Sequence, residues 1–346
     1  MTGQHFTTHL LALSDDTGLA QHARYRFVDR SHGYCLDDNA RAATVLCRLA
    51  KVRSLSRREE AALASYCAFI DHAFDRASLR FRNFMGYDCR WLEKEGAEDA
   101  SARAMLALSV MIAMPPLPWM RNWARDLLDQ MLPGLHQFSS PRSWSFVLTG
   151  LNMLLRIDPS WQEAEKIREN LALRLLQRWR DAAMPHWPWF EDELAYDNGR
   201  LPQAAIATGT TLGMTELRSA GLSALDALWN WQFDGAVFHP VGSDSFGRKH
   251  EAPSRFDQQP IDVSAMIDAC MTAAAAGAKP DLWRTRADVA MAWFFGRNDL
   301  QTPVVESVRG LCHDGLHADR MNANAGAEST LAYLGAALSM IAPETL

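Results

Sequence analysis

The stretch NANAGAESTLAYLGAALSMIA, residues 322–342, joins a polar loop directly to a helix-forming run of small and apolar residues. The loop is rich in amides, and the acidic residue Glu328 stands where the apolar run begins. A helix that is apolar nearly all round belongs in the interior of a protein. This stretch therefore predicts a buried helix whose N-terminus faces a polar region.

The same arrangement occurs four more times along the chain. Loops rich in carboxylates, amides and aromatic residues run into apolar helices at positions roughly 55 to 100 residues apart, about the length of one or two helical hairpins. We therefore expect a ring of inner helices whose N-termini converge on one polar cavity. The four stretches are GYCLDDNAR (33–41), WLEKEGAEDASAR (91–103), WPWFEDELAYDNGRLPQA (187–204) and RFDQQPIDVSA (255–265).

Helical periodicity extends through most of the chain, and strand-like alternation is almost absent. In the order of the chain, every second predicted helix is apolar nearly all round, and the helices between them are charged on one face, so inner and outer helices alternate. We expect an all-α fold, an (α/α)6 toroid of six helical hairpins, forming a single domain over residues 1–346. The predicted helices are 4–14, 37–51, 56–75, 98–114, 118–136, 142–157, 159–181, 200–213, 215–233, 260–277, 279–296 and 326–342.

The connections between these helices differ in length. Long loops are more often functional than idle, and we expect them at one mouth of the toroid, where they include short extended pieces. The short connections are expected at the opposite end. The long connections are 15–36, 76–97, 182–199, 234–259 and 297–325, and the short ones are 52–55, 115–117, 137–141, 158, 214 and 278.

Composition excludes several classes of protein. Apolar residues make up 48% and charged residues 22% of the chain, which is ordinary for a globular protein. The net charge is −6 and the basic residues are scattered, so we expect no nucleic-acid partner. The six cysteines form no CxxC pair and are taken as reduced thiols. The N-terminus resembles no signal peptide and no apolar run reaches ~18 residues, so we expect a cytoplasmic protein without a membrane partner.

Carboxylates at the starts of the inner helices are the candidate catalytic residues. Unpaired backbone N–H groups at helix N-termini surround the expected mouth, which suits a polyhydroxyl ligand. A single acidic residue at such a position is also explained as a helix cap, and Glu328 is the most informative because a buried helix would otherwise carry it at a cost. The candidates are Asp38, Glu98, Asp99, Asp197, Asp262 and Glu328.

Aromatic and amide side chains in the same loops are the candidate substrate-binding residues. Aromatic rings stack on the C–H surfaces of sugars, while amides and carboxylates bind sugar hydroxyls. Tryptophans on helices are interpreted as core residues instead. The candidates are Tyr34, Asp37, Asn39, Trp91, Trp187, Trp189, Tyr196, Arg200, Gln259 and Asn324.

Motifs for other chemistries are missing from the sequence. It contains no GxGxxG after a strand, no P-loop and no GxSxG elbow. The histidines form no HExxH, and the nearest metal-like spacing is HDGLH, residues 313–317, for which a metal is the weaker interpretation. We expect no metal and no cofactor.

With six hairpins and acidic loops at one end, the chain resembles the six-hairpin glycosidase superfamily. Within it, the chain is most similar to a bacterial group often encoded beside glycosyltransferases or mannoside phosphorylases, which implies a functional link to one of these enzymes. It departs from the pattern of the group at residues 100–102 and 324–325. The resemblance rests on DDTGLAQHA (15–23), GYCLDDNARA (33–42), FMGYDCRWLEKEGAEDASAR (84–103), YDNGRLPQA (196–204), FDQQPID (256–262) and NANAGAESTLAYL (322–334).

Three functions fit these observations. The leading hypothesis is a glycoside hydrolase that cleaves an oligosaccharide with one carboxylic acid and one carboxylate, by inversion if the two lie ~6.5–9.5 Å apart. A sugar epimerase of the same toroid would use histidines as proton shuttles, from among His186, His239 and His250, if two of them face each other. A non-catalytic glycan-binding or glycosyltransferase-partner protein is the third.

Overall fold

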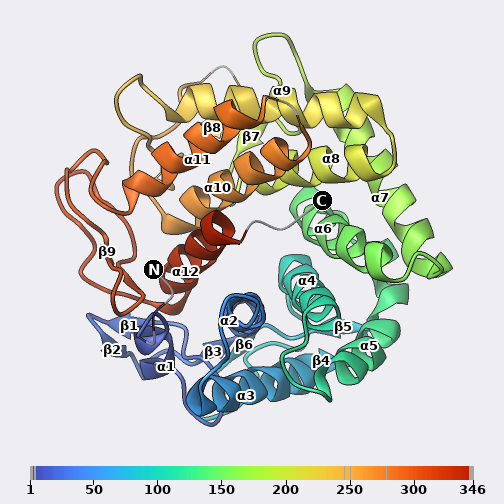
Figure 1. Ribbon diagram of the computed structural model, residues 1–346, viewed down its shortest axis with the longest axis vertical. Helices are drawn as coiled ribbons and strands as arrows, with labels where there is room; N and C mark the ends of the chain where they lie inside the picture. The colour runs from blue at the N-terminus through green and yellow to red at the C-terminus, as the bar shows by residue number, and fades with distance from the viewer. Residues whose placement is uncertain (1–2, 4, 245, 250, 278, 343–346) are drawn as a thin grey trace.

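Twelve α-helices form most of the part of the chain that the structure describes, and they alternate between two rings (Figure 1). The structure is a computed structural model that describes residues 3, 5–244, 246–249, 251–277 and 279–342. The outer helices are α1 (Thr8–Ala12), α3 (Arg57–Ala73), α5 (Met120–Met131), α7 (Gln162–Ala182), α9 (Thr215–Gln232) and α11 (Pro280–Trp293). The inner helices are α2 (Leu36–Leu49), α4 (Glu98–Ala113), α6 (Pro141–Ile157), α8 (Arg200–Thr211), α10 (Pro260–Ala275) and α12 (Ala327–Ile341).

The inner helices form a closed ring. Each packs against the next along the chain, and α12 packs against α2. Each inner helix also packs against one outer helix, and the sixth hairpin joins α12 to the N-terminal α1. All twelve helices therefore lie where the sequence predicts them, and the (α/α)6 toroid is confirmed.

Burial separates the two rings as the sequence pattern predicts. On α10 every residue from Pro260 to Ile267 is buried, whereas α7 exposes one face to solvent along its length. One hydrophobic cluster extends from Phe6, next to α1, to Leu338 in α12. The main core thus lies between the rings, and both polar and apolar residues face the toroid axis.

Short antiparallel strand pairs link the long loops, as predicted. The segment that leads into the strand at residues 34–35 passes so close to Met85 that position 33 requires glycine, because a Cβ there would lie 1.9 Å from the carbonyl oxygen of Met85. The pairs are β1 (Ala23–Arg24) with β2 (Phe27–Val28), β3 (Tyr34–Cys35) with β6 (Phe84–Met85), β4 (Phe74–Asp75) with β5 (Arg80–Phe81), β7 (Glu193–Leu194) with β8 (Gly247–Arg248), and β9 (Val305–Glu306) with β10 (Leu311–Cys312). The β3–β6 and β7–β8 pairs tie the loops before neighbouring inner helices to each other.

One connection differs from the prediction. The segment between α5 and α6 was expected among the short connections at the opposite end, but it leads from an outer to an inner helix and so lies at the long-loop mouth. It includes the 3-10 helix Leu132–Gln137 and ends at Ser140, whose side chain caps α6. The prediction was wrong because it used the length of the connection. Whether a connection lies at the mouth or at the opposite end of the toroid depends on whether it leads from an outer to an inner helix or the reverse.

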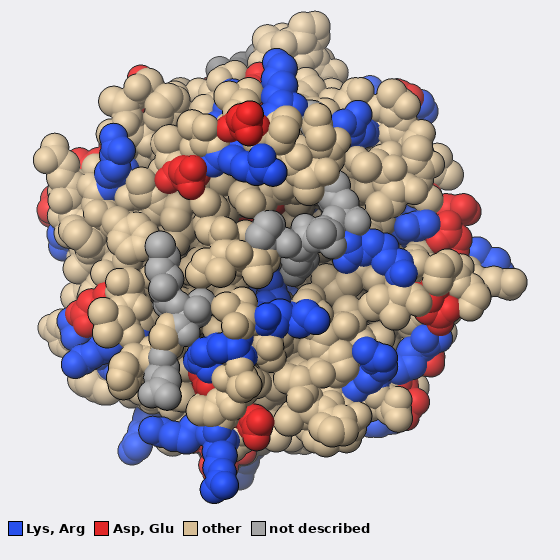
Figure 2. All heavy atoms as spheres, in the orientation of Figure 1, with Lys and Arg blue, Asp and Glu red and all other residues tan. Residues whose placement is uncertain are grey.

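Basic residues on the face drawn in Figure 2 are separated by neutral and acidic side chains. A nucleic-acid surface would join such residues into a patch or stripe. No helix within the described ranges combines the length and the apolar character needed to cross a membrane.

The N-terminus of α3 provides a first testable prediction, on stability. Ser56 and Glu59 form a capping box, and the buried Glu59 carboxylate also accepts hydrogen bonds from Thr7 (2.6 Å) and Arg53 (2.6 Å). Although burial opposes it, these partners hold the pKa of Glu59 at about 2. We expect Glu59→Gln to cost about 1.5–3 kcal/mol at pH 7, the worth of hydrogen bonds to a charged group.

Because the folded-state pKa of Glu59 is lowered, its contribution is complete above the unfolded-state pKa of ~4.3 and is lost as pH falls toward 2. Urea unfolding at several pH values should therefore show that the difference in free energy of unfolding between wild type and Glu59→Gln disappears at acid pH. The exposed neighbour Glu60 supplies the control, since Glu60→Gln should change stability little at any pH. A gap that does not depend on pH would contradict the prediction.

Candidate active site

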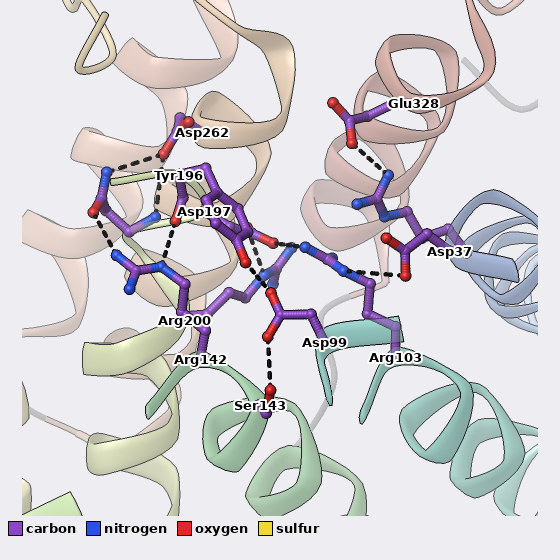
Figure 3. Close-up of polar contacts among 12 residues, drawn as sticks. Asp37, Asp99, Arg103, Arg142, Ser143, Tyr196, Asp197, Arg200, Asp262 and Glu328 are labelled. Carbon is purple, nitrogen blue, oxygen red and sulfur yellow. Dashed lines mark hydrogen bonds and ion pairs between the residues drawn. The ribbon is translucent and has the colours of Figure 1, made fainter. Parts of the chain in front are cut away.

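Four inner helices carry an arginine within their first two turns, and each arginine contacts a carboxylate, with Arg142 on α6 paired to Glu191 (2.6 Å). On α2, Arg41 donates to Asp38 (Nη1–Oδ1 3.3 Å), and on α8, Arg200 donates to Asp197 (Nε–Oδ1 3.1 Å). Arg103 on α4 reaches across to Asp197 as well (Nη2–Oδ2 2.9 Å). Acid and base side chains therefore alternate around the long-loop mouth (Figure 3).

Asp197 holds this arrangement together. Its side chain is fully buried and lies between Arg103 and Arg200, with one oxygen on each (Figure 3). Burial would raise the pKa of Asp197, but the two guanidinium groups outweigh it, so the pKa is below its usual range. Arg200 also donates to Asp268 on α10 (2.6 Å). Asp197 is therefore an ionised carboxylate whose oxygens are both occupied, which suits a structural anchor.

Arg41 joins two carboxyl groups with opposite surroundings. The same nitrogen, Nη1, contacts Asp38 at 3.3 Å and Glu328 on α12 at 2.8 Å. Asp38 is 2% exposed and accepts a hydrogen bond from the Cys35 thiol (3.1 Å), whereas the Glu328 side chain is 48% exposed. Burial raises the pKa of Asp38 to about 7, although Arg41 opposes it. Asp38 can thus hold a proton near neutral pH at the mouth, beside a carboxylate that solvent reaches.

Asp262, in the first turn of α10, is a second buried carboxyl group. Its Oδ1 accepts hydrogen bonds from the backbone nitrogen (3.1 Å) and the side-chain nitrogen (3.3 Å) of Asn198. Burial and the nearby charge of Asp197 raise the pKa of Asp262 to about 7. Arg142 on α6 donates to Asn198 from the other side (3.3 Å). These contacts fix the loop before α8 between α6 and α10 (Figure 3).

Asp99 binds the tip of the loop before α8. It accepts hydrogen bonds from Ser143 on α6 (2.6 Å) and from the hydroxyl of Tyr196 (Figure 3). Burial and the charge of Asp99 raise the pKa of Tyr196, so the phenol stays protonated and donates. Tyr196 is 40% exposed, and Arg142 lies over its ring at 5.3 Å. A half-exposed aromatic ring is therefore held at the mouth.

A cavity of about 180 Å³ runs along the toroid axis and is walled by all six inner helices. One water needs ~10–15 Å³, so the cavity accepts a cluster of waters or a small ligand. At the mouth it is bounded by the site arginines and by Glu328, and deeper in by both polar and apolar side chains. The residues around it include Arg41, Arg48, Arg103, Phe146, Asn152, Arg156, Arg200, Gln203, Thr211, Ser264, Asp268, Thr272, Glu328 and Ser339.

Comparison with known proteins identifies the fold. No family model matches the chain, and no curated protein matches it either. Solved structures do. A sugar epimerase from a ruminal bacterium has a TM-score of 0.75 at 10% identity, covering 100% of this chain and 98% of that one. Cellobiose 2-epimerase from Spirochaeta thermophila has a TM-score of 0.71 at 12% identity, covering 98% of this chain and 94% of that one.

A third match is an inactive variant of alpha-1,6-mannanase from Salegentibacter, with two aspartates replaced by alanine, in complex with alpha-1,6-mannotetrose. Its TM-score is 0.67 at 9% identity, covering 98% of this chain and 96% of that one. The fold is that of the six-hairpin glycosidases. The six-hairpin toroid accommodates both epimerases and a mannanase, so the fold alone leaves the reaction open.

Among the predicted catalytic residues, Glu98 is the one that the six-hairpin fold turns away from the arginines. It accepts hydrogen bonds from the backbone nitrogens of Ser139 (2.7 Å) and Ser140 (2.9 Å) in the α5–α6 connection. This use of its carboxylate is structural, because it satisfies N–H groups that precede α6. The other five predicted carboxylates all take part in the contacts around the mouth.

Two predicted stacking residues lie in the core instead. Trp187 is 4% and Trp189 0% exposed, and both pack against Trp231 on α9, with ring centroids 4.8 Å and 6.1 Å away. No sugar can reach either ring in this arrangement. Trp91 is partly buried and packs on Phe69. The aromatic clustering near residue 187 was therefore a sign of core packing between a loop and an outer helix.

The remaining predicted binding residues divide by their contacts. Asp37 faces Arg103 at 3.8 Å within the site and Arg200 lines the cavity. Four others hold loops: the Tyr34 hydroxyl donates to Asp15, Asn39 bonds the backbones of residues 19 and 35, Gln259 donates to Asp257, and Asn324 accepts from the backbone nitrogen of Tyr25.

The histidines named for the epimerase hypothesis are not gathered at the cavity. His239 is half-buried near Arg255, and His186 is an exposed loop residue. His250 lies outside the described residues. Neither of the two described histidines lines the cavity. Within the described ranges, no three His, Cys, Asp or Glu side chains are placed to hold a metal ion.

The sequence interpretation missed two of the site arginines, Arg41 and Arg103, whereas Arg200 was among the predicted substrate-binding residues. Arg41 follows Asp38 by three residues on α2, and such spacing places the two side chains on one helix face. The spacing in DDNAR was therefore a readable signal of this ion pair. The carboxylates that contact Arg103 lie on other parts of the chain, so local spacing could not reveal them.

Proposed function

We propose that this protein is a glycoside hydrolase that cleaves an oligosaccharide at the long-loop mouth. One observation carries the proposal: Asp38 and Glu328 share the guanidinium of Arg41 but differ in burial. Two carboxyl groups whose environments set them apart are the usual form of an acid and base pair. A neutral acid and an ionised carboxylate are what glycosidic cleavage requires.

The two residues take different roles. Asp38 is buried with its pKa raised to about 7, so it is the general acid that protonates the leaving oxygen. Glu328 is half-exposed and held by Arg41, so it is the carboxylate that acts at the anomeric carbon. The ion pair with Arg41 (2.8 Å) orients the Glu328 carboxylate.

The separation of the pair bears on stereochemistry. Both carboxyl oxygens contact the same nitrogen, at 3.3 Å and 2.8 Å, so they lie no farther apart than the sum of these distances. For these two oxygens, the limit is below the ~6.5–9.5 Å that separates the carboxyl groups of inverting enzymes. We therefore propose retention with Glu328 as the nucleophile, in place of the inversion expected from the sequence.

The names of the similar structures support a sugar substrate but not one reaction. The mannanase variant is described in complex with a mannooligosaccharide, while two other matches are sugar epimerases. Hydrolysis is preferred because Glu328 lines the cavity, whereas neither of the two described histidines named for epimerisation does. The experiment described next separates hydrolysis from sugar epimerisation and from the absence of catalysis, while a link to a glycosyltransferase or glycoside phosphorylase stays a prediction.

The test is incubation of the purified protein with mannooligosaccharides and glucooligosaccharides, followed in time by proton NMR of the anomeric signals. We expect a new reducing-end signal whose first anomer has the configuration of the cleaved bond. If the first anomer instead has the inverted configuration, the catalytic base is a carboxylate farther from Asp38 than Glu328. A different sugar without cleavage would replace hydrolysis by epimerisation, and unchanged oligosaccharides would contradict catalysis.

A further inference from the structure

The loop over residues 20–34 rests on the N-terminus of α12, next to Glu328. The backbone nitrogen of Ala327 donates to the carbonyl oxygen of Gln21 (3.1 Å), and that of Ala325 donates to the carbonyl of Tyr25 (2.8 Å). His22 follows Gln21 directly, so its backbone is fixed within one residue of the turn that carries Glu328. Nothing in the acid and base assignment uses this loop.

Two imidazole rings meet on this loop. His22 and His32 have ring centroids 4.4 Å apart and an interplanar angle of 66°, an edge-to-face contact. Both histidines are exposed to solvent, outside the lining of the axial cavity. Two polar rings held edge to face beside a solvent-exposed carboxylate form a preorganised group of hydrogen-bonding atoms.

Burial and the neighbouring charges together set the protonation state of His22. Burial and the neighbouring His32 lower the pKa of His22, while Asp314, Glu328 and Asp29 act in the opposite direction. The lowering prevails, so the ring is neutral at pH 7. A neutral imidazole offers one donor and one acceptor nitrogen, which matches a hydroxyl group that also both donates and accepts.

We propose that His22, positioned by His32, is a subsite residue that binds a hydroxyl of the sugar unit seated against Glu328. The proposal rests on the proposed function for the identity of the ligand, a neutral sugar. It adds a contact on the α12 side of the mouth, opposite the core tryptophans that the sequence suggested for sugar binding.

Binding of a simple sugar tests the subsite without any need for turnover. We would titrate wild type and His22→Gln with methyl α-mannoside, methyl α-glucoside and mannotriose, following the histidine ring signals by NMR and the affinity by calorimetry. The His22 signals, assigned by their loss in His22→Gln, should shift on binding. The variant should bind about 3- to 10-fold more weakly, as expected for loss of one net hydrogen bond.

A matched control is His239→Gln, which changes a half-buried histidine in the loop before α10, near Arg255, and should leave affinity unchanged. Thermal unfolding of both variants checks that the fold is kept. Equal affinity in wild type and His22→Gln, or sugar binding that leaves the His22 signals in place, would overturn the subsite. Sugar binding that needs His22 in a protein that cleaves nothing would retain the subsite and remove the hydrolase proposal.

Discussion

Glu328→Gln should lower kcat on a cleaved oligosaccharide by a factor on the order of 10²–10⁴, the range for removal of one acid or base group. The amide keeps the shape of the side chain and a hydrogen bond with Arg41 but loses the charge that attacks the anomeric carbon. Because Glu328 is half-exposed, folding should be unaffected. The measurement is kcat and KM from the rate of reducing-end formation, together with the thermal midpoint.

The chain provides a close control for this substitution. Glu98 also stands in the first turn of an inner helix, yet its carboxylate is bonded to the backbone of Ser139 and Ser140. Glu98→Gln should leave kcat within about twofold while lowering stability by the worth of a hydrogen bond, ~1 kcal/mol. If both variants lose activity equally, or Glu328→Gln stays active, the role given to Glu328 is wrong.

The partner Asp38 should impose a pH dependence of known sign. A general acid works only when protonated, and the pKa of Asp38 is about 7, so activity should fall as pH rises above 7. Asp38→Asn should reduce kcat by a similar factor, and its residual activity should lack the alkaline decline. An alkaline limb that persists in Asp38→Asn would assign the acid to another group, with the buried Asp262 the first to examine.

The fold could be predicted from the sequence because the inner helices are apolar nearly all round, whereas the outer helices carry charged residues on one face. Asp38 and Glu328 were predicted because carboxylates before apolar helices are costly unless they face a polar cavity. Both contact Arg41 in the structure, and their catalytic roles stay a prediction. The difference between Glu98 and Asp99 was not readable. The two residues are adjacent, and their directions depend on Ser139 and Ser143, about forty residues away in the sequence.

The prediction that Trp187 and Trp189 stack on sugar was wrong for the same reason, since contacts far along the chain decided their positions. A loop rich in aromatic rings is compatible with stacking on sugar or on the protein itself, and the choice was made by Trp231 on α9. Local sequence could not reveal that partner. The His22–His32 contact likewise depends on the hairpin of the loop before α2, whose strands β1 and β2 are two residues long and too short to predict.

Asp197→Ala should destabilise the protein by about 3–5 kcal/mol, the cost of removing one partner from a buried ion pair. Arg103 is nearly as buried as Asp197, with 7% of its side chain exposed, and the substitution would leave its charge facing only Asp37 at 3.8 Å. The backbone adds to the cost, since Asp197 has φ of +54°, which aspartate and asparagine tolerate better than alanine. Denaturant unfolding at pH 7 measures the effect.

Two further variants separate charge from geometry. Asp197→Asn keeps the backbone preference and one acceptor oxygen, so it should cost less than Asp197→Ala at pH 7. Because the pKa of Asp197 is lowered on folding, the charge contributes above the unfolded value of ~3.9 and is lost as pH falls through the folded value. The difference in free energy of unfolding between wild type and Asp197→Asn should therefore become smaller at acid pH.

Asp192 provides the surface comparison for Asp197. Its ion pair with Lys249 (3.1 Å) leaves the carboxylate side chain 81% exposed, so Asp192→Asn should cost at most ~1 kcal/mol. If Asp197→Ala were as mild as Asp192→Asn, the arginines at the mouth would not depend on this anchor. Their placement around Glu328 would then have to come from Asp37 and Asp268, and loss of either should disturb catalysis more than loss of Asp197.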